Sequence, residues 1–172
     1  MVVATQNPIE MEGTYPLPEA QRDRFMTRIT MGYPSRDSEL EMLERHGAHN
    51  PLDELYPVTH GERITELIDV VGSVYVADVV KDYLVNIVAA TRSHDAVRLG
   101  ASPRASLHLI RTARAKAALA GRDYVIPDDV QAMAIPVLAH RLLPSTRAQL
   151  DGISPVDIVS QILTSTPVPE QV

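Results

Sequence analysis

An asparagine near the start of the chain has the side-chain type and the position to handle a phosphate or a water. Asn7 follows the β-branched run Val2–Thr5, where a predicted strand ends. Ligands in open α/β sheets bind just beyond the carboxyl ends of the strands, and an amide there orients a water or a phosphate oxygen without adding charge. Asn7 is followed by Pro8, and this pair taken alone is typical of an ordinary turn.

Arg24 is a second residue with the chemistry for phosphate. It follows a predicted helical turn and stands beside Phe25, the only phenylalanine, which we expect to be buried and to fix the direction of Arg24. An arginine that meets a γ-phosphate in the transition state raises the rate about a thousandfold or more. Arg22 is the rival for this role. A surface ion pair of Arg24 with Asp23 or Glu19, worth under about 1 kcal/mol, is the structural alternative.

Arg104 stands where local electrostatics disfavour it. It lies in the first turn of a helix predicted to open at Ser102, and the helix dipole disfavours a cation there by roughly a few tenths of a kcal/mol. A phosphate at that end would offset the cost, while Gly100 would permit close backbone approach and Ser102 would cap the helix. A solvated arginine, or one paired with Asp95, is the alternative.

Several motifs are missing from the sequence. No Gly-x-x-x-x-Gly-Lys-Ser/Thr occurs and no apolar strand ends in Asp-Glu, so the phosphate loop and the magnesium ligands of a P-loop enzyme are not encoded here. His46, His49 and His60 fall at a predicted helix end and loop with no carboxylate at a ligand spacing, so no metal site is predicted. No Gly-x-Ser-x-Gly motif occurs either.

Composition bounds the class of protein. The 172 residues are 45% hydrophobic and 22% charged, with a formal net charge of −6, which argues against a general nucleic-acid binder. Of the 16 basic residues, 14 are arginine, the side chain that grips carboxylate or phosphate with two parallel hydrogen bonds. The absence of cysteine fits a reducing compartment. With no signal-peptide pattern and no apolar run of membrane-spanning length, a cytoplasmic protein without membrane insertion is expected.

The chain divides into three predicted regions. Val2–Thr5 resembles a buried strand, and the alternation over residues 25–31 predicts a second. Because two strands do not make a stable sheet, residues 1–32 are interpreted as the carboxyl-terminal edge of a larger α/β domain whose earlier strands are absent. Residues 33–164 are predicted to form a helical domain, and residues 165–172 a disordered tail.

Helical periodicity and capping residues define the second region. Helices are predicted over residues 35–45, 59–71, 77–91, 102–120, 127–138 and 154–163. The apolar stripes expected to face the core are Ile64, Leu67, Ile68 and Val71 in the second helix and Val80, Tyr83, Leu84, Ile87 and Val88 in the third. Thr59 with Glu62 predicts a capping box, and Pro136 predicts a break or kink. Two β-prone pieces, residues 74–76 and 124–126, could pair with each other.

Motifs in this order resemble those of one protein family. Ala4–Glu10 looks like the sensor-1 strand of MoxR-family AAA+ ATPases, and Gly13–Gln21 followed by Asp23–Phe25 looks like their arginine-finger segment. Gly100–Ala105 resembles their sensor-2 motif. Val125–Val130 and Pro136–Leu142 resemble their lid helices. Three motifs in the right order are far more specific than any one alone, and the resemblance covers nearly the whole chain up to about residue 143.

The resemblance implies a mainly α fold, with a helical AAA+ lid domain preceded by the last two strands of an incomplete α/β P-loop sheet. Asn7 would be sensor 1, polarising the attacking water or the γ-phosphate. Arg24 would be the finger that reaches a neighbouring subunit's nucleotide, and Arg104 the lid arginine that contacts nucleotide in its own subunit. Arg22 departs from the family, which usually has an apolar residue there.

The resemblance also implies a biological role. Family members hydrolyse ATP with Mg²⁺, assemble into homo-oligomeric rings and act as chaperone-type ATPases in the assembly or maturation of protein complexes, with partners that carry a von Willebrand factor A domain. Because this chain lacks the Walker A and B half, we expect it to be inactive alone and to bind neither ATP nor Mg²⁺ tightly. The alternatives are a non-catalytic helical interaction module derived from AAA+ proteins and a magnesium-chelatase-type motor subunit.

Overall fold

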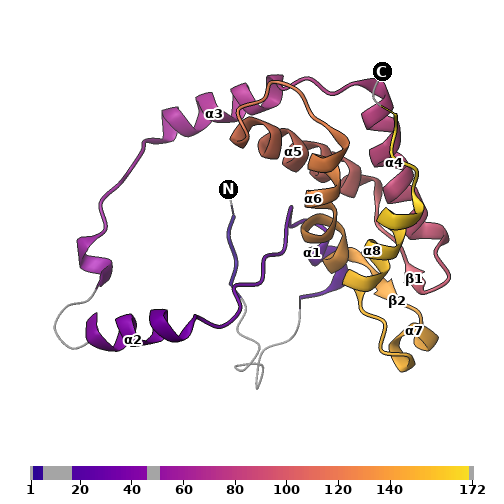
Figure 1. Ribbon diagram of the computed structural model, residues 1–172, viewed down its shortest axis with the longest axis horizontal. Coiled ribbons are helices and arrows are strands. Elements are labelled where there is room, and N and C mark those ends of the chain that lie inside the picture. The colour runs from indigo at the N-terminus through magenta and orange to yellow at the C-terminus, as the bar shows by residue number, and fades with distance from the viewer. Residues whose placement is uncertain (1, 6–16, 46–50, 171–172) are drawn as a thin grey trace.

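The computed structural model describes residues 2–5, 17–45 and 51–170. Four helices pack together into a helical body that spans residues 74–165 (Figure 1). These helices are α4 (Asp78–Ser93), α5 (Pro103–Leu119), α6 (Pro127–Leu138) and α8 (Pro155–Ser165). Shorter elements complete the body, namely the 3-10 helix η2 (Ala139–Arg141) and the helix α7 (Thr146–Leu150). The mainly α class predicted from the sequence is confirmed.

The core of the body forms where the sequence predicts it. The predicted stripe of α4 is buried along its whole length, and the side chains of Ile87, Leu109, Leu138 and Ile158 are less than 2% exposed. The helix ends also follow the predicted chemistry. Gly121 adopts a φ of +74° just beyond α5, and Ser154 Oγ accepts a hydrogen bond from the Asp157 N–H at 3.2 Å to cap α8.

Two short pairings of extended chain tie the body together. Strand β1 (Val97–Leu99) pairs antiparallel with β2 (Leu143–Pro144). The pairing expected between residues 74–76 and 124–126 is confirmed as a parallel bridge, in which the Tyr75 N–H donates to the Asp123 carbonyl at 2.8 Å and the Val125 N–H donates to the Tyr75 carbonyl at 2.9 Å.

The two predicted N-terminal segments are not paired as strands. Among the described residues before Ser35 no strand forms, and Val2 and Val3 are 80% and 76% exposed. The expectation that Val2–Thr5 is buried is therefore wrong for this chain. The physical reason is that a strand is completed by the neighbours that accept and donate its backbone hydrogen bonds, and no such neighbour pairs with Val2–Thr5 among the residues that the structure describes.

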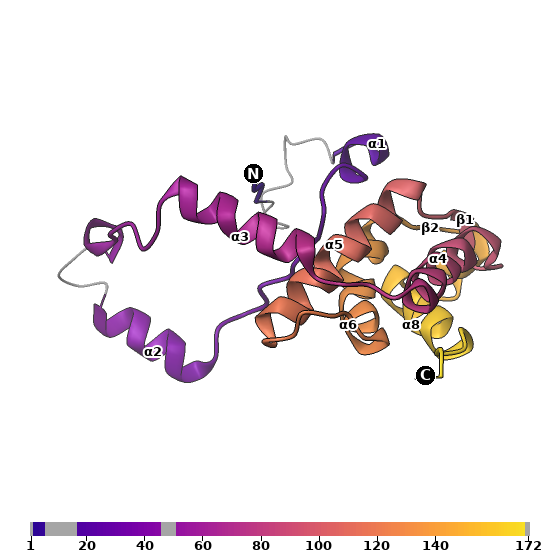
Figure 2. The ribbon, with the colours of Figure 1, turned by 90° about the horizontal axis from the view of Figure 1, so that it is seen from above.

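An arm of helices extends to one side of the body (Figures 1 and 2). It consists of α2 (Arg36–Arg45), the 3-10 helix η1 (Pro51–Glu54) and α3 (Gly61–Ser73). Ser35 Oγ accepts from the Ser38 N–H at 3.2 Å, as expected for the start of α2. However, α3 begins at Gly61 without a side-chain cap, so the box predicted from Thr59 and Glu62 is not formed.

The predicted apolar stripe of α3 is also not buried. No residue of this helix is buried, and Ile64, Leu67 and Ile68 are 45%, 46% and 64% exposed. The amphipathic pattern correctly predicted a helix. Burial of its apolar side chains, however, requires other elements to pack along the whole length of the stripe. In Figure 2 only one end of α3 passes over the helical body.

The break predicted at Pro136 is displaced by two residues. Helix α6 continues through Pro136 to Leu138 and then tightens into η2. A proline inside a helix removes one N–H donor, which is tolerated here so near the end of the helix. The Pro136 carbonyl accepts a hydrogen bond from the Arg28 N–H at 2.9 Å, and this bond joins the N-terminal segment to the helical body.

Candidate functional site

Asp23 brings together groups that are far apart in the sequence. It follows the single-turn helix α1 (Glu19–Arg22). Ser102 Oγ donates to both carboxylate oxygens of Asp23 at 3.0 Å, and Arg141 Nε donates to Oδ1 at 3.2 Å. Nη1 of Arg104 lies 3.6 Å from Oδ2. The short segment around Asp23 is therefore attached to the start of α5 and to the end of η2.

Arg104, in the first turn of α5, has an anion beside it, and that anion is part of the same chain. The partner is Asp23, and the pair predicted as an alternative with Asp95 is not formed. The Arg104 side chain remains 48% exposed. Ser102 occupies the N-cap position without a side-chain cap bond, because its hydroxyl points to Asp23, so the expected capping role of this side chain is wrong.

Gly100 permits a close backbone approach, although the close partner is not a ligand. A Cβ atom at this position would lie 2.6 Å from the Thr91 carbonyl oxygen and 2.7 Å from Arg92 Cα. The Ala101 N–H donates to Thr91 Oγ1 at 3.0 Å, and Arg92 Nε donates to the Ala101 carbonyl at 2.8 Å. Glycine is thus required for packing the entry to α5 against the end of α4.

The structure distinguishes the two candidate finger arginines by exposure. Arg24 is exposed, and its guanidinium makes no hydrogen bond or ion pair with any residue that the structure describes. The predicted alternative, an ion pair with Asp23 or Glu19, is therefore not observed. Arg22 is half-buried, with its Nε shielded from solvent. Phe25 is half-buried rather than buried.

Asn7 lies outside the described residues, as do His46 and His49. Within the described ranges there is no group of three or more His, Cys, Asp or Glu side chains that could hold a metal ion. None of the described helices is long and apolar enough to cross a lipid bilayer.

Arg141 is the residue of this site that the sequence reasoning missed. Its side chain is only 1% exposed. Besides Asp23, its guanidinium donates to the carbonyls of Phe25, Met26 and Val137. The available signal was Arg141, a charged residue next to His140 inside the apolar stretch that begins at Ala134, because a buried cation needs specific acceptors.

Two histidines beside Arg141 are held neutral. Burial, reinforced by the charge of Arg141, lowers the pKa of His140 from its ordinary value of 6.5 to about 4. The same causes in the same order lower the pKa of His108. Since arginine only donates, His108 Nδ1, which lies 2.5 Å from Arg141 Nη2, acts as an acceptor.

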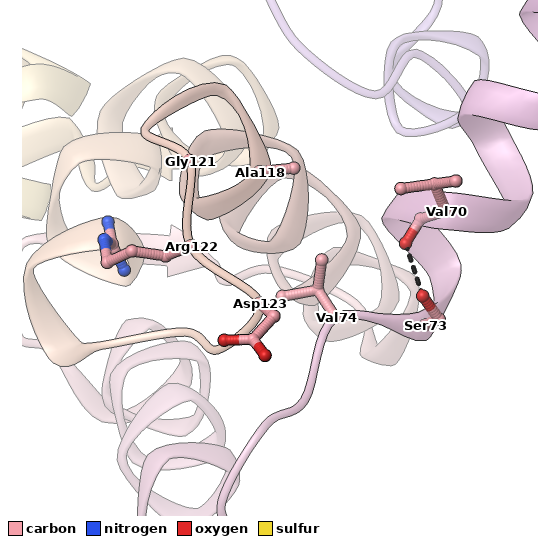
Figure 3. Close-up of a pocket in the computed structure, with 7 residues that line it drawn as sticks. All are labelled: Val70, Ser73, Val74, Ala118, Gly121, Arg122 and Asp123. Atoms are coloured by element: carbon pink, nitrogen blue, oxygen red, sulfur yellow. Dashed lines mark hydrogen bonds between the residues drawn. The ribbon is translucent and has the colours of Figure 1, made fainter.

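The structure has two surface hollows of note, and neither gathers the candidate residues. The first, of about 260 Å³, lies between the end of α3 and the turn after α5. Figure 3 shows the Arg122 side chain directed away from Val70 and Ser73, whose own hydrogen bond is internal to α3. The second, of about 430 Å³, is lined by Arg28, Pro136, His140 and their neighbours. Neither contains Arg24 or Arg104.

Family models match two parts of the chain. Residues 89–162 match the AAA lid domain, and residues 1–27 match the ATPase family associated with various cellular activities (AAA). The first match covers the helical body from the end of α4 to α8, and the second covers the segment that contains Asn7 and Arg24.

Curated relatives and a solved structure match nearly the whole chain. It is 46% identical to the uncharacterised protein YeaC of Bacillus subtilis over 99% of this chain and 53% of that protein. It is 41% identical to the chaperone MoxR1 of Mycobacterium tuberculosis over 99% of this chain and 47% of that protein. A crystal structure of a candidate ATPase from Cytophaga hutchinsonii superposes with a TM-score of 0.87 at 34% identity, covering 96% of this chain and 53% of that one. The chain thus spans about half the length of the relatives it matches.

Proposed function

Because this chain belongs to the MoxR family of AAA+ ATPases, we propose that it is the nucleotide-responding part of a complete protein that hydrolyses ATP. In this proposal Arg24 is the arginine finger that acts on a neighbouring subunit's nucleotide. Arg104 contacts the nucleotide of its own subunit, and Asn7 orients the attacking water or the γ-phosphate.

The observation that carries the proposal is the place of the two arginines relative to Asp23. Arg104 contacts the Asp23 carboxylate at 3.6 Å, and Arg24 is the next residue along the chain. The residue suited to sense nucleotide within the subunit is therefore connected to the residue suited to act between subunits. Exposure supports the same assignment, since Arg24 is exposed and Arg22 is half-buried.

The residues present fit a phosphate ligand but not a complete nucleotide site. Arg104 is half-exposed beside a helix N-terminus, so its guanidinium and the backbone N–H groups there have the donors that phosphate oxygens accept. ATP with Mg²⁺ supplies the phosphoryl group that is transferred to water. Arg24 would contribute when negative charge spreads over that group, by electrostatic stabilisation of the transition state.

The biological setting follows from the family and remains part of the proposal. A relative is named chaperone MoxR1, which supports a chaperone-like role in the assembly or maturation of protein complexes. Ring-shaped homo-oligomers, partners with a von Willebrand factor A domain and a cytoplasmic location stay predictions. A finger that acts in trans requires a neighbouring subunit, so the ring is the part of this setting that the assignment of Arg24 needs.

The test uses the complete protein, with both halves of the ATPase. Arg24→Ala should leave ATP affinity nearly unchanged and lower turnover by about a hundredfold or more. The matched control is Arg147→Ala, which removes a 93% exposed arginine on α7 and should change neither quantity. Arg22→Ala, assayed in parallel, should lower turnover much less than Arg24→Ala.

Mixed rings test where the finger acts. Arg24→Ala subunits mixed with subunits unable to bind ATP should recover part of the activity, because some interfaces then join an intact Arg24 to an intact nucleotide site. No recovery in rings shown to be mixed would place the action of Arg24 within its own subunit. A complete protein with no ATP hydrolysis at all would favour the non-catalytic interaction module.

A further inference from the structure

The buried guanidinium of Arg141 lies against the segment that presents Arg24. A guanidinium has five N–H donors in a rigid planar fork, and a buried charge is tolerated only when acceptors satisfy it. Arg141 Nε donates to Asp23 Oδ1 at 3.2 Å, and Nη2 donates to the Asp23 backbone carbonyl at 3.3 Å. Both the side chain and the backbone of the residue before Arg24 are therefore held.

Further acceptors come from the residues after Arg24. Arg141 Nη2 donates to the Phe25 carbonyl and Nη1 donates to the Met26 carbonyl at 3.4 Å. The backbone is thus fixed on both sides of Arg24 by one side chain. The turn of α1 adds a local bond, from the Arg24 N–H to the Gln21 carbonyl at 3.1 Å. The Arg24 side chain itself stays exposed.

Three further acceptors surround the terminal nitrogens of Arg141, and their arrangement suits a guanidinium. His108 Nδ1 lies 2.5 Å from Nη2 of Arg141, and His140 Nε2 lies 2.9 Å from Nη1. The other acceptor around the fork is the Val137 carbonyl of α6. A lysine ammonium is a compact charge with three donors on one nitrogen. At position 141 it could not reach all the acceptors that lie around the three separate nitrogens of the guanidinium.

We propose that Arg141 is the positioning residue for Arg24, because it anchors residues 23–26, which carry Arg24, to the end of α6. This inference rests on the proposed function, in which Arg24 acts on a neighbouring nucleotide. Its mechanical consequence is that the helical body and the finger of one subunit move as one unit.

The test is a double-mutant cycle in the complete ATPase, with ATP affinity and turnover measured separately. Arg141→Lys keeps the charge and loses the fork, and it should lower kcat about tenfold or more while changing the Kd for ATP less than twofold. In the Arg24→Ala background, Arg141→Lys should lower kcat by less than twofold further. Arg147→Lys, on the exposed face of α7, is the control and should have no effect in either background.

The outcomes separate the two proposals. Unchanged turnover in Arg24→Ala would overturn the proposed finger. If Arg24→Ala lowers turnover, but Arg141→Lys lowers kcat equally with and without Arg24, then Arg141 does not act through Arg24 and the positioning role is wrong. A parallel loss of ATP affinity and kcat in Arg141→Lys would likewise indicate a general structural defect.

Hydrogen–deuterium exchange is a second measurement that does not depend on ATPase activity. It tests whether Arg141 anchors the segment around Arg24 even if the variant loses turnover through instability. In the Arg141→Lys protein, amides of the 19–28 segment should exchange about tenfold faster, while those in the middle of α4 and α5 keep their protection. Faster exchange throughout the helical body, or unchanged exchange in the 19–28 segment, would contradict the anchoring role.

Discussion

The Asp23 carboxylate lies beside Arg104, with Oδ2 3.6 Å from Nη1 of the guanidinium. A carboxylate and a phosphate are alternative partners for the same arginine, since both accept from its N–H groups. If Arg104 contacts nucleotide, its guanidinium must either lose its contact with Asp23 or bind the carboxylate and a phosphate at the same time. Asp23 is therefore in competition with the nucleotide in the proposed function.

Removing this competitor should strengthen nucleotide binding. In the complete protein, Asp23→Asn should lower the Kd for ATP by about threefold to tenfold, because one negative charge is removed a few ångströms from the phosphate position. Isothermal titration at low and at high salt measures this effect, which should shrink at high salt. Asp151→Asn, on an exposed carboxylate paired with Arg147, is the control. An unchanged or weaker affinity in Asp23→Asn would show that Arg104 keeps Asp23 while nucleotide is bound.

The buried ion pair at the start of α6 should contribute strongly to stability. Asp129 is 3% exposed and accepts from both terminal nitrogens of Arg122 at 2.6 and 2.7 Å, and from the Ile126 N–H at 3.0 Å. Asp129→Asn should lower the free energy of unfolding by about 2 kcal/mol, since it leaves part of this network unsatisfied. Asp128→Asn, at the exposed neighbouring position, should change it by less than about 0.5 kcal/mol. Equal urea midpoints for the two variants would contradict the assignment.

Gly100 and Gly72 should respond oppositely to alanine. A methyl group at Gly100 would meet backbone atoms of Thr91 and Arg92 within 2.8 Å, and backbone cannot move aside as a side chain can, so Gly100→Ala should cost about 1–3 kcal/mol. At Gly72, inside α3, no atom beyond the adjacent residues and the nearby backbone of the helix itself lies within 4 Å of the added carbon. Gly72→Ala should therefore be neutral or stabilise the protein by about 0.5–1 kcal/mol. Thermal unfolding of both variants measures the contrast.

Local features of the sequence were sufficient to predict the helical body. The stripe from Val80 to Val88 predicted the buried face of α4, and Ser154 predicted the cap of α8. Each of these signals lies within a few residues and depends on helix geometry alone. The same reasoning failed for α3, where the stripe containing Ile64 is correct as helix periodicity but none of the residues of the helix is buried.

The site could be predicted only in part, because its key contacts join distant parts of the chain. Arg104 and Arg24 were selected by local electrostatics and by the family motif. The contact of Asp23 with Ser102 spans 79 residues and that with Arg141 spans 118, and no periodicity encodes such a pairing. The sequence indicated that an anion near Arg104 would meet the electrostatic cost of its position, with a solvated arginine as the alternative, and the structure places Asp23 there. Which anion would meet it depended on the fold.

The histidine beside Arg141 should make stability depend on pH. The pKa of His140 is lowered by burial and by Arg141 to about 4, against an ordinary value of 6.5. Between these values the unfolded chain binds more protons than the folded one, so the free energy of unfolding rises with pH. The stabilising effect of a neutral His140 is fully present above about pH 6.5 and is lost progressively toward pH 4. From pH 8 to pH 5 the loss amounts to about 2 kcal/mol.

Replacing His140 should remove this part of the pH dependence. In urea unfolding of the His140→Gln chain, the fall in the free energy of unfolding from pH 8 to pH 5 should be smaller than in the parent chain by about 2 kcal/mol. His108, whose pKa is also lowered, should keep a residual slope in the same direction. A His140→Gln profile parallel to that of the parent would contradict this prediction. It would show that His140 accepts a proton in the folded state as readily as in the unfolded chain, so that its imidazole is not held neutral beside Arg141.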